Sequence, residues 1–447
     1  MNPKEVSGFI VKEGLKSGAD EIAAIAAHGT SRQVRFANNE ITVTKTWDQT
    51  SASILLKKDR RILIASVTDV SEDSIRNALK KLAQTVNIMK PHENYAPLPE
   101  GPFEYQTIPS LYDDRIPKLT EKHVDYVEAA INAAVESGAK RVAGTLLATD
   151  LESSLATSRN VEGMQKKTTI NLVVRALTNG ESSGMGITCG TTLRDFDPEK
   201  AGGEAGRLAR MSLNATSGKS GRYEVVLTRP AAAVFFDIVA GMDSAFYVDA
   251  GISCLAEKLG EDVAFDGLTV YDDPRVAGGL GSTPFDDEGN PTERTTIVEG
   301  GKLRAYLHNS LTAKKYKTKS TANAGWISPH AWNIVVKEGK HAEKELLEGV
   351  KNGLYLNNIT YVRFQDYRKG DFSAIIRDGV FKIENGEITK AVKGLRLSDN
   401  ILHMLQNTTA LSKEPKQIAH WWMEFETPSV ITPLIRLRDV EFTVPTK

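Results

Sequence analysis

Hydrophobic residues recur at helical spacing in several segments of the first 240 residues. The first helix is expected over residues 3–17, ending at Gly18, and the second runs from Glu72 to about Met89, with Ser71 placed to cap its N-terminus. Three more helices are expected at residues 120–138, 199–214 and 230–239. The last of these is apolar on nearly every side and begins with Pro230, so we expect a buried helix.

Alternating polar and apolar residues between these helices predict strands. They lie at residues 21–28, 30–37, 41–48, 52–57 and 61–68, and again at 142–158, 167–177 and 181–191. The order of a helix followed by strands therefore occurs twice, and Ser137-Gly138-Ala139 repeats Ser17-Gly18-Ala19. This repetition suggests two related units in the first half of the chain.

The segment from Pro91 to Pro117 contains six prolines and four aromatic residues. Such a segment does not form a helix, and its aromatic residues argue against a solvated linker. We expect an extended crossing on a domain surface.

The second half is dominated by strand patterns. Strands are expected at 223–227, 268–271, 294–298, 303–308 and 432–444, with shorter helices at 252–260 and 341–352. Asn385-Gly386 between two β-rich runs predicts a hairpin. The fold class is therefore α+β, with an N-terminal domain of helices and antiparallel strands at 1–220 and a C-terminal, mostly-β domain at 221–447.

The composition and net charge of the chain argue against some classes of function. The 447 residues are 40% hydrophobic, which suffices for two cores, and the 56 basic and 57 acidic residues give no global field that would attract nucleic acid or an anionic membrane. The basic run at 314–319 is more typical of a solvated loop than of a nucleic-acid contact. Cys189 and Cys254 fit reduced, buried thiols, and neither an export signal nor an apolar run of eighteen residues is present. We expect a cytoplasmic protein.

Three adjacent acidic residues stand out in a long loop between two predicted strands. Asp286, Asp287 and Glu288 precede Gly289, Asn290 and Pro291, which are turn-forming residues. The carboxylates either cap backbone N–H groups of a solvated turn or border a functional cavity.

Four motifs resemble the TldD/PmbA family, also called the modulator of DNA gyrase family. They are S-T-P-F-D-D-E-G at 282–289, R-T-x-x-V-E-x-G-x-L at 294–303, G-D-F-S at 370–373 and I-E-N-G-E-I at 383–388. The resemblance covers residues 220–400 well. It implies a barrel-like sheet against which the apolar helix packs.

In the peptidase branch of this family, the TldD branch, that helix carries H-E-x-x-x-H, and a cysteine near the C-terminus completes a zinc site. Residues 229–243 contain neither histidine nor glutamate, no two of the eight histidines are three to five residues apart, and no cysteine follows Cys254. A catalytic zinc site needs several nitrogen or sulfur ligands. We therefore predict no catalytic residue, metal ligand or cofactor in this chain.

This pattern resembles the PmbA or TldE type of subunit. The resemblance implies a noncatalytic partner of a TldD-type zinc peptidase, forming a heterodimer that degrades or trims unfolded or extended peptides in an internal cavity. The candidates for lining that cavity or contacting the peptide are Asp286, Asp287, Glu288, Arg294 and His308.

Other functions stay open at this stage. The chain could act alone as a regulator or scaffold, in line with the family's association with DNA gyrase and toxin–antitoxin control, or as an independent hydrolase. Phosphate-binding loops and nucleophile elbows are absent. The sequence does not decide whether the isolated chain forms a homodimer.

Overall fold

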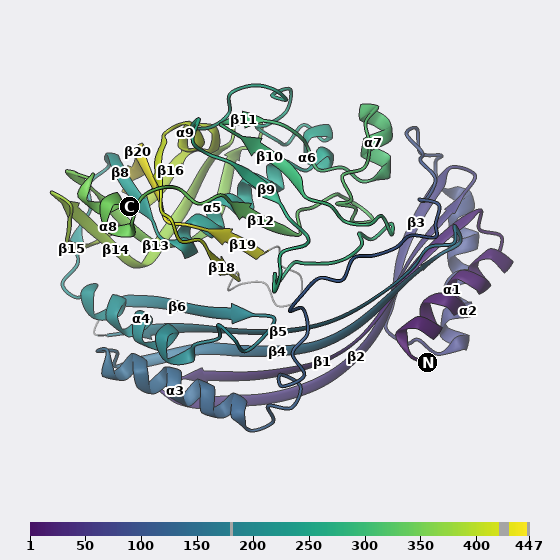
Figure 1. The fold of residues 1–447 in the computed structure, drawn as a ribbon, viewed down its shortest axis with the longest axis horizontal. Helices are drawn as coiled ribbons and strands as arrows, with labels where there is room; N and C mark the ends of the chain where they lie inside the picture. The colour runs from purple at the N-terminus through teal and green to yellow at the C-terminus, as the bar shows by residue number, and fades with distance from the viewer. Residues whose placement is uncertain (179–181, 420–428, 445–447) are drawn as a thin grey trace.

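The computed structural model describes residues 1–178, 182–419 and 429–444. Figure 1 shows a long, curved sheet formed by the N-terminal half, with the C-terminal half on the side toward which the strands curve. The expected α+β class is confirmed, because helices and antiparallel strands alternate in the first half and strands dominate the second.

The first sheet has six antiparallel strands in the order β3-β2-β1-β4-β5-β6. They are β1 (Glu21–Ala37), β2 (Glu40–Lys58), β3 (Arg61–Val67), β4 (Arg141–Thr157), β5 (Glu162–Leu177) and β6 (Ser183–Gly190). The prediction of separate strands at 21–28 and 30–37, and at 41–48 and 52–57, is wrong. Each pair is one continuous strand, because the intervening residues keep their ladder partners on β2 or β1.

Two helix pairs cover this sheet at opposite ends (Figure 1). α1 (Pro3–Lys16) and α2 (Glu72–Thr85) pack at one end, followed by the short 3-10 turn η1 (Val86–Ile88), and α3 (Lys122–Glu136) and α4 (Pro198–Met211) pack at the other. Ser71 caps α2 as predicted. A Cβ atom on Gly202 would lie 2.0 Å from the backbone oxygen of Ala130, so glycine allows α4 to approach α3.

The proline-rich segment crosses the molecule without helix or strand, as predicted. Its buried side chains include Ala96, Leu98, Ile108, Leu111 and Ile116. These contacts explain why it is an ordered crossing.

The C-terminal half contains two further sheets. One has six strands in the order β11-β10-β9-β12-β19-β18. Their bounds are β9 (Val270–Asp272), β10 (Thr295–Glu299), β11 (Lys302–Leu303), β12 (Asn333–Val336), β18 (Lys416–Ile418) and β19 (Ser429–Thr432).

The other sheet has eight strands in the order β13-β8-β20-β16-β14-β15-β7, and β17 pairs with β20. Its strands are β7 (Thr216–Ser217), β8 (Gly221–Leu227), β13 (Asn352–Asp366), β14 (Asp371–Glu384), β15 (Glu387–Lys393), β16 (Arg396–Asn400), β17 (Thr408–Leu411) and β20 (Ile435–Thr443). Because β13 also pairs with β14, five strands form a ring, and the sheet is only partly barrel-like. Asn385-Gly386 makes the expected hairpin between β14 and β15.

The apolar helix α5 (Arg229–Met242) lies between these two sheets, as expected of a helix without a polar face. It contacts β8 and β13 of the ring and β12, β18 and β19 of the other sheet. Phe235 and Phe236 are among the largest fully buried side chains. In the described part of the chain, no helix is long and apolar enough to span a membrane.

Two predictions for the second half are wrong. The helix expected at 252–260 is absent, since Glu257 has a left-handed φ of 62°; a short helix α6 (Ala245–Asp249) precedes that segment. The strand expected at 303–308 ends after Leu303, and Leu307 forms only an isolated bridge with Ser244. Helices α7 (Ser310–Tyr316), α8 (Glu343–Glu348) and α9 (Ile401–Gln406) complete the fold.

Candidate functional site

The acidic loop folds around the side chain of Asp286. This carboxylate is fully buried and accepts hydrogen bonds from the backbone N–H groups of Glu288 (3.0 Å), Asn290 (2.8 Å) and Ala324 (3.2 Å), and from the Asn290 amide. Burial, together with the neighbouring Glu288 carboxyl, raises the pKa of Asp286 well above its usual value. Its position fits a loop-organising residue.

Glu288 joins three parts of the molecule. Its carboxylate is 3% exposed and accepts hydrogen bonds from the backbone N–H (3.1 Å) and the hydroxyl of Ser310, at the start of α7. Burial raises the pKa of Glu288, while the positive charge of Lys57 and the Ser310 hydrogen bonds oppose that rise. Lys57 comes from β2 of the first sheet, so its charge acts on Glu288 from the other half of the chain.

Lys57 is itself buried, with 1% of its surface exposed. Its ammonium donates to the carbonyl oxygen of Ala96 at 2.9 Å and lies 5.6 Å from the centre of the Tyr95 ring. Burial lowers the pKa of Lys57, and the nearby Glu288 and Glu21 carboxylates oppose that shift. A buried lysine beside a buried carboxylate is typical of a fixed internal contact.

The other predicted residues lie in different environments. Asp287 is half-buried, and its backbone carbonyl accepts from the Trp326 indole at 2.8 Å. Arg294 is exposed, with its guanidinium 3.5 Å from the centre of the Tyr271 ring.

His308 is 5% exposed and has its Nδ1 3.2 Å from the Thr312 hydroxyl. Burial lowers the pKa of His308 to about 4, so the imidazole is neutral at pH 7. The structure thus brings Asp286, Glu288 and His308 into one buried region, since Glu288 bonds to Ser310, two residues after His308. Arg294 lies on the surface.

Two further buried acids escaped sequence reasoning. Asp243 caps the C-terminal end of α5 and Asp272 ends β9, and both are 0% exposed. Asp272 accepts from the backbone N–H groups of Trp332 (2.7 Å) and Asn333 (2.9 Å), and burial raises its pKa to about 7. The available signal for Asp243 was its position directly after the apolar run of α5, a helix that also contains Asp237.

The residues of α5 do not fit a catalytic zinc ion. The buried residues of this helix are alanine, valine, phenylalanine and methionine, which offer no nitrogen or thiolate ligand. Across residues 1–178, 182–419 and 429–444, no group of three or more histidine, cysteine, aspartate or glutamate side chains is arranged to hold a metal ion. His420, Trp421 and Trp422 lie outside the described residues.

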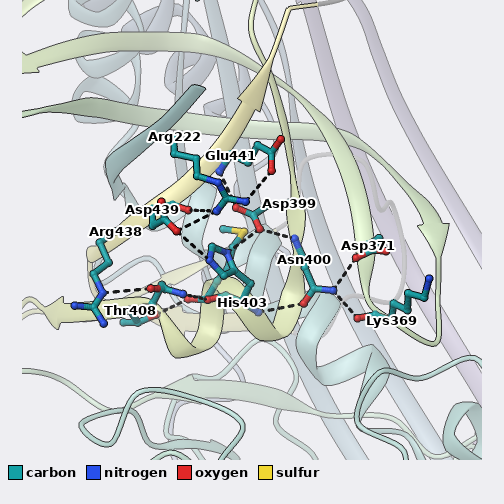
Figure 2. A network of polar contacts seen from close by, with 12 residues as sticks. Arg222, Lys369, Asp371, Asp399, Asn400, His403, Thr408, Arg438, Asp439 and Glu441 are labelled. Atoms are coloured by element: carbon teal, nitrogen blue, oxygen red, sulfur yellow. Dashed lines mark hydrogen bonds and ion pairs between the residues drawn. The ribbon is translucent and has the colours of Figure 1, made fainter. Parts of the chain in front are cut away.

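A second polar cluster combines side chains from β8, β16, β20 and α9 (Figure 2). His403 of α9 has its Nδ1 2.9 Å from Asp399 and its Nε2 3.5 Å from Asp439. Arg222 forms ion pairs with Asp439 (3.0 Å) and Glu441 (2.9 Å). Its acids are each paired with a basic group, so this cluster fits a structural clamp between strands.

Sequence models of one family match nearly the whole chain. The PmbA/TldA metallopeptidase C-terminal domain matches residues 220–444, the central domain matches 115–213, and domain 1 matches 23–85. The C-terminal match contains α5, the acidic loop and the His403 cluster.

Individual relatives agree with this match. A metalloprotease of Methanothermobacter thermautotrophicus is 32% identical over 65% of this chain and 66% of its own length. The metalloprotease PmbA of Escherichia coli is 28% identical over 51% of this chain and 49% of its own. The matches thus span from about half to about two thirds of these relatives. The crystal structure of TldE from Thermococcus kodakarensis has the same fold, with a TM-score of 0.83 and 21% identity over 98% of this chain and 100% of that one.

Proposed function

Because this chain belongs to the PmbA/TldD family of metallopeptidases, we propose that it is the noncatalytic, TldE-type subunit of a two-protein peptidase. Its partner would be a TldD-type chain that carries zinc, and the pair would cleave unfolded or extended peptides. The observation that carries this proposal is helix α5, which is buried between two sheets and offers no zinc ligands on its buried face.

The role proposed for each candidate residue follows from its burial and its hydrogen bonds. The carboxylates of Asp286 and Glu288 accept internal hydrogen bonds. They would therefore stabilise the acidic loop, and other side chains would contact the peptide. Asp287 and Arg294 are partly or fully accessible. An acidic and a basic side chain beside the loop could bind the backbone or charged groups of an extended peptide. Zinc in the partner would activate the attacking water.

Reconstitution with a partner tests the proposal. The purified chain alone should contain no stoichiometric zinc and should not cleave a fluorescent, unstructured peptide. Mixing it with an H-E-x-x-x-H relative from the same genome should give a stable complex by size-exclusion chromatography, with zinc bound and the peptide cleaved. Zinc-dependent cleavage by the isolated chain would instead identify an independent hydrolase. Failure to form any complex would favour a stand-alone regulator.

Variants in the reconstituted complex test the peptide-contact role. Arg294→Ala should lower kcat/KM about tenfold, corresponding to about 1.4 kcal/mol, while complex formation is unchanged. The matched control is Glu293→Ala, which removes an exposed charge on the neighbouring residue. If Arg294→Ala and Glu293→Ala cleave the peptide with the same kcat/KM, Arg294 is not part of the peptide-binding surface.

A further inference from the structure

The end of α5 holds a buried carboxylate, that of Asp243. Asp243 is 0% exposed, and neither of its side-chain oxygens has a hydrogen-bond partner among the described residues. Isolating an ionised carboxylate from both water and donors is strongly unfavourable. The side chain therefore needs either a bound proton or a cation.

A chain of hydrogen bonds connects Ser244, the residue after Asp243, to the β9 sheet. The Ser244 hydroxyl donates to the Pro329 carbonyl at 2.7 Å, and the next residue, His330, exchanges backbone and side-chain hydrogen bonds with Asn323. The Asn323 amide also donates to Asp272 at 2.6 Å. The end of α5, the 329–330 segment, Asn323 and β9 therefore form one connected unit.

Unpartnered oxygens gather in this unit. Besides both Asp243 oxygens, the Asn323 side-chain oxygen has no hydrogen-bond partner in the part of the chain that the structure describes, and Asn323 is 0% exposed. Burial raises the pKa of Asp243, and so does the negative charge of Asp272, which places the two carboxyls within electrostatic range.

We propose that Asp243, Asp272 and Asn323 form a buried binding site for a hard divalent cation, represented by Ca²⁺. Carboxylate and amide oxygens are the ligands that such cations prefer, and two carboxylates match a charge of two. The set contains no nitrogen or sulfur ligand, which distinguishes it from a zinc site. A cation here would fasten α5 to the β9 sheet. This proposal is independent of the proposed peptidase partnership.

Calcium binding to the full chain tests the site. After treatment with EDTA and removal of the chelator, CaCl₂ should bind with a stoichiometry near one by calorimetry and should raise the Tm, because a ligand of the folded state stabilises it. Asp243→Asn keeps the shape and removes one charge, so it should weaken Ca²⁺ binding at least tenfold and abolish the Tm response. Asp266→Asn changes an exposed acid and should leave both unchanged.

Other salts and a second variant test whether the response is specific to Ca²⁺ and to the proposed ligands. MgCl₂ should bind more weakly than CaCl₂, and a Tm rise in NaCl equal to that in CaCl₂ at the same ionic strength would overturn the proposal. No response to about 10 mM CaCl₂, roughly tenfold above the weakest protein calcium sites, would also overturn it. If Asp243→Asn fails to fold, Asn323→Ala keeps both carboxylates and should weaken Ca²⁺ binding. Unchanged affinity in Asn323→Ala would contradict the proposed ligand set.

Discussion

The C-terminal half contains two clusters of acidic residues that differ in their partners. Around the acidic loop, Asp272, Asp286 and Glu288 are buried and are held mainly by backbone N–H groups, amides and hydroxyls. Around His403, the acids Asp439 and Glu441 are about half exposed and pair with Arg222 (Figure 2).

The same residue types therefore have opposite energetic roles. Around Arg222, water screens the half-exposed Asp439 and Glu441 carboxylates, so these ion pairs contribute little to the free energy of unfolding. In the buried cluster, removing one acceptor leaves several donors without water or protein partners, which is costly. Burial also raises the pKa values of Asp272, Asp286 and Glu288.

The largest effect is expected for Asp286→Ala. This change leaves the backbone N–H groups of Glu288, Asn290 and Ala324 without their acceptor. We expect the free energy of unfolding to fall by about 3–5 kcal/mol in urea denaturation. Asp266→Ala, at an exposed position, should change it by less than about 0.5 kcal/mol. Similar losses of unfolding free energy in the two variants would show that the buried hydrogen bonds of Asp286 add little to stability.

A pH dependence should follow from His308. Its folded pKa of about 4 lies below the ordinary value of 6.5, so the neutral imidazole stabilises the fold above pH 6.5 and this contribution is lost as the pH falls toward 4. Compared with His308→Gln, the wild type should lose about 1.4 kcal/mol per pH unit across that window.

The measurement is urea denaturation of both proteins at several pH values between 4 and 7. The raised pKa of Asp272, about 7, has the opposite sign, since its contribution is lost as the pH rises. Only the difference between wild type and variant isolates His308. Parallel profiles of the two proteins would show that this imidazole titrates normally.

The link between Lys57 and Glu288 should give an intermediate effect. A double-mutant cycle with Lys57→Met and Glu288→Gln should yield a coupling energy of about 1–2 kcal/mol, because both groups are buried. The control cycle is Lys4 with Glu162, an ion pair at 3.8 Å whose side chains are 62% and 74% exposed. That pair should couple by less than about 0.5 kcal/mol. Equal coupling in both cycles would show that burial does not strengthen the contact.

Local patterns predicted the elements whose determinants are short in sequence. Ser71 at the start of α2, Pro230 at the start of α5 and the Asn385-Gly386 hairpin each act within a few residues. The suggested repeat also fits the topology, because α1 and α3 each precede three antiparallel strands, and β1 pairs with β4 at the centre of the sheet. Gly18 and Gly138 both have positive φ values, 91° and 113°, directly after their helices.

Features that depend on distant partners could not be predicted. The strand containing Gly29 continues because β2 and β4 flank it on both sides, and neither neighbour can be recognised from the local pattern. Likewise, the sequence Asp286-Asp287-Glu288 does not reveal whether its carboxylates face water or backbone N–H groups. Only the packing of Ala324 and Ser310 against the loop decides that Asp286 and Glu288 are internal.

The smallest effect is expected for Arg222→Ala in the His403 cluster. Its two ion pairs, at 3.0 and 2.9 Å, involve side chains about half exposed, so the free energy of unfolding should fall by about 0.5–1 kcal/mol at low ionic strength. In 1 M NaCl, where screening acts over about 3 Å, this loss should shrink. Arg438→Ala is the matched control, because its guanidinium donates to the neutral Asn407 amide at 3.2 Å and its contribution should not vary with salt. A salt-independent loss for Arg222→Ala would mean that packing of the arginine stem, rather than charge, holds β8 against β20.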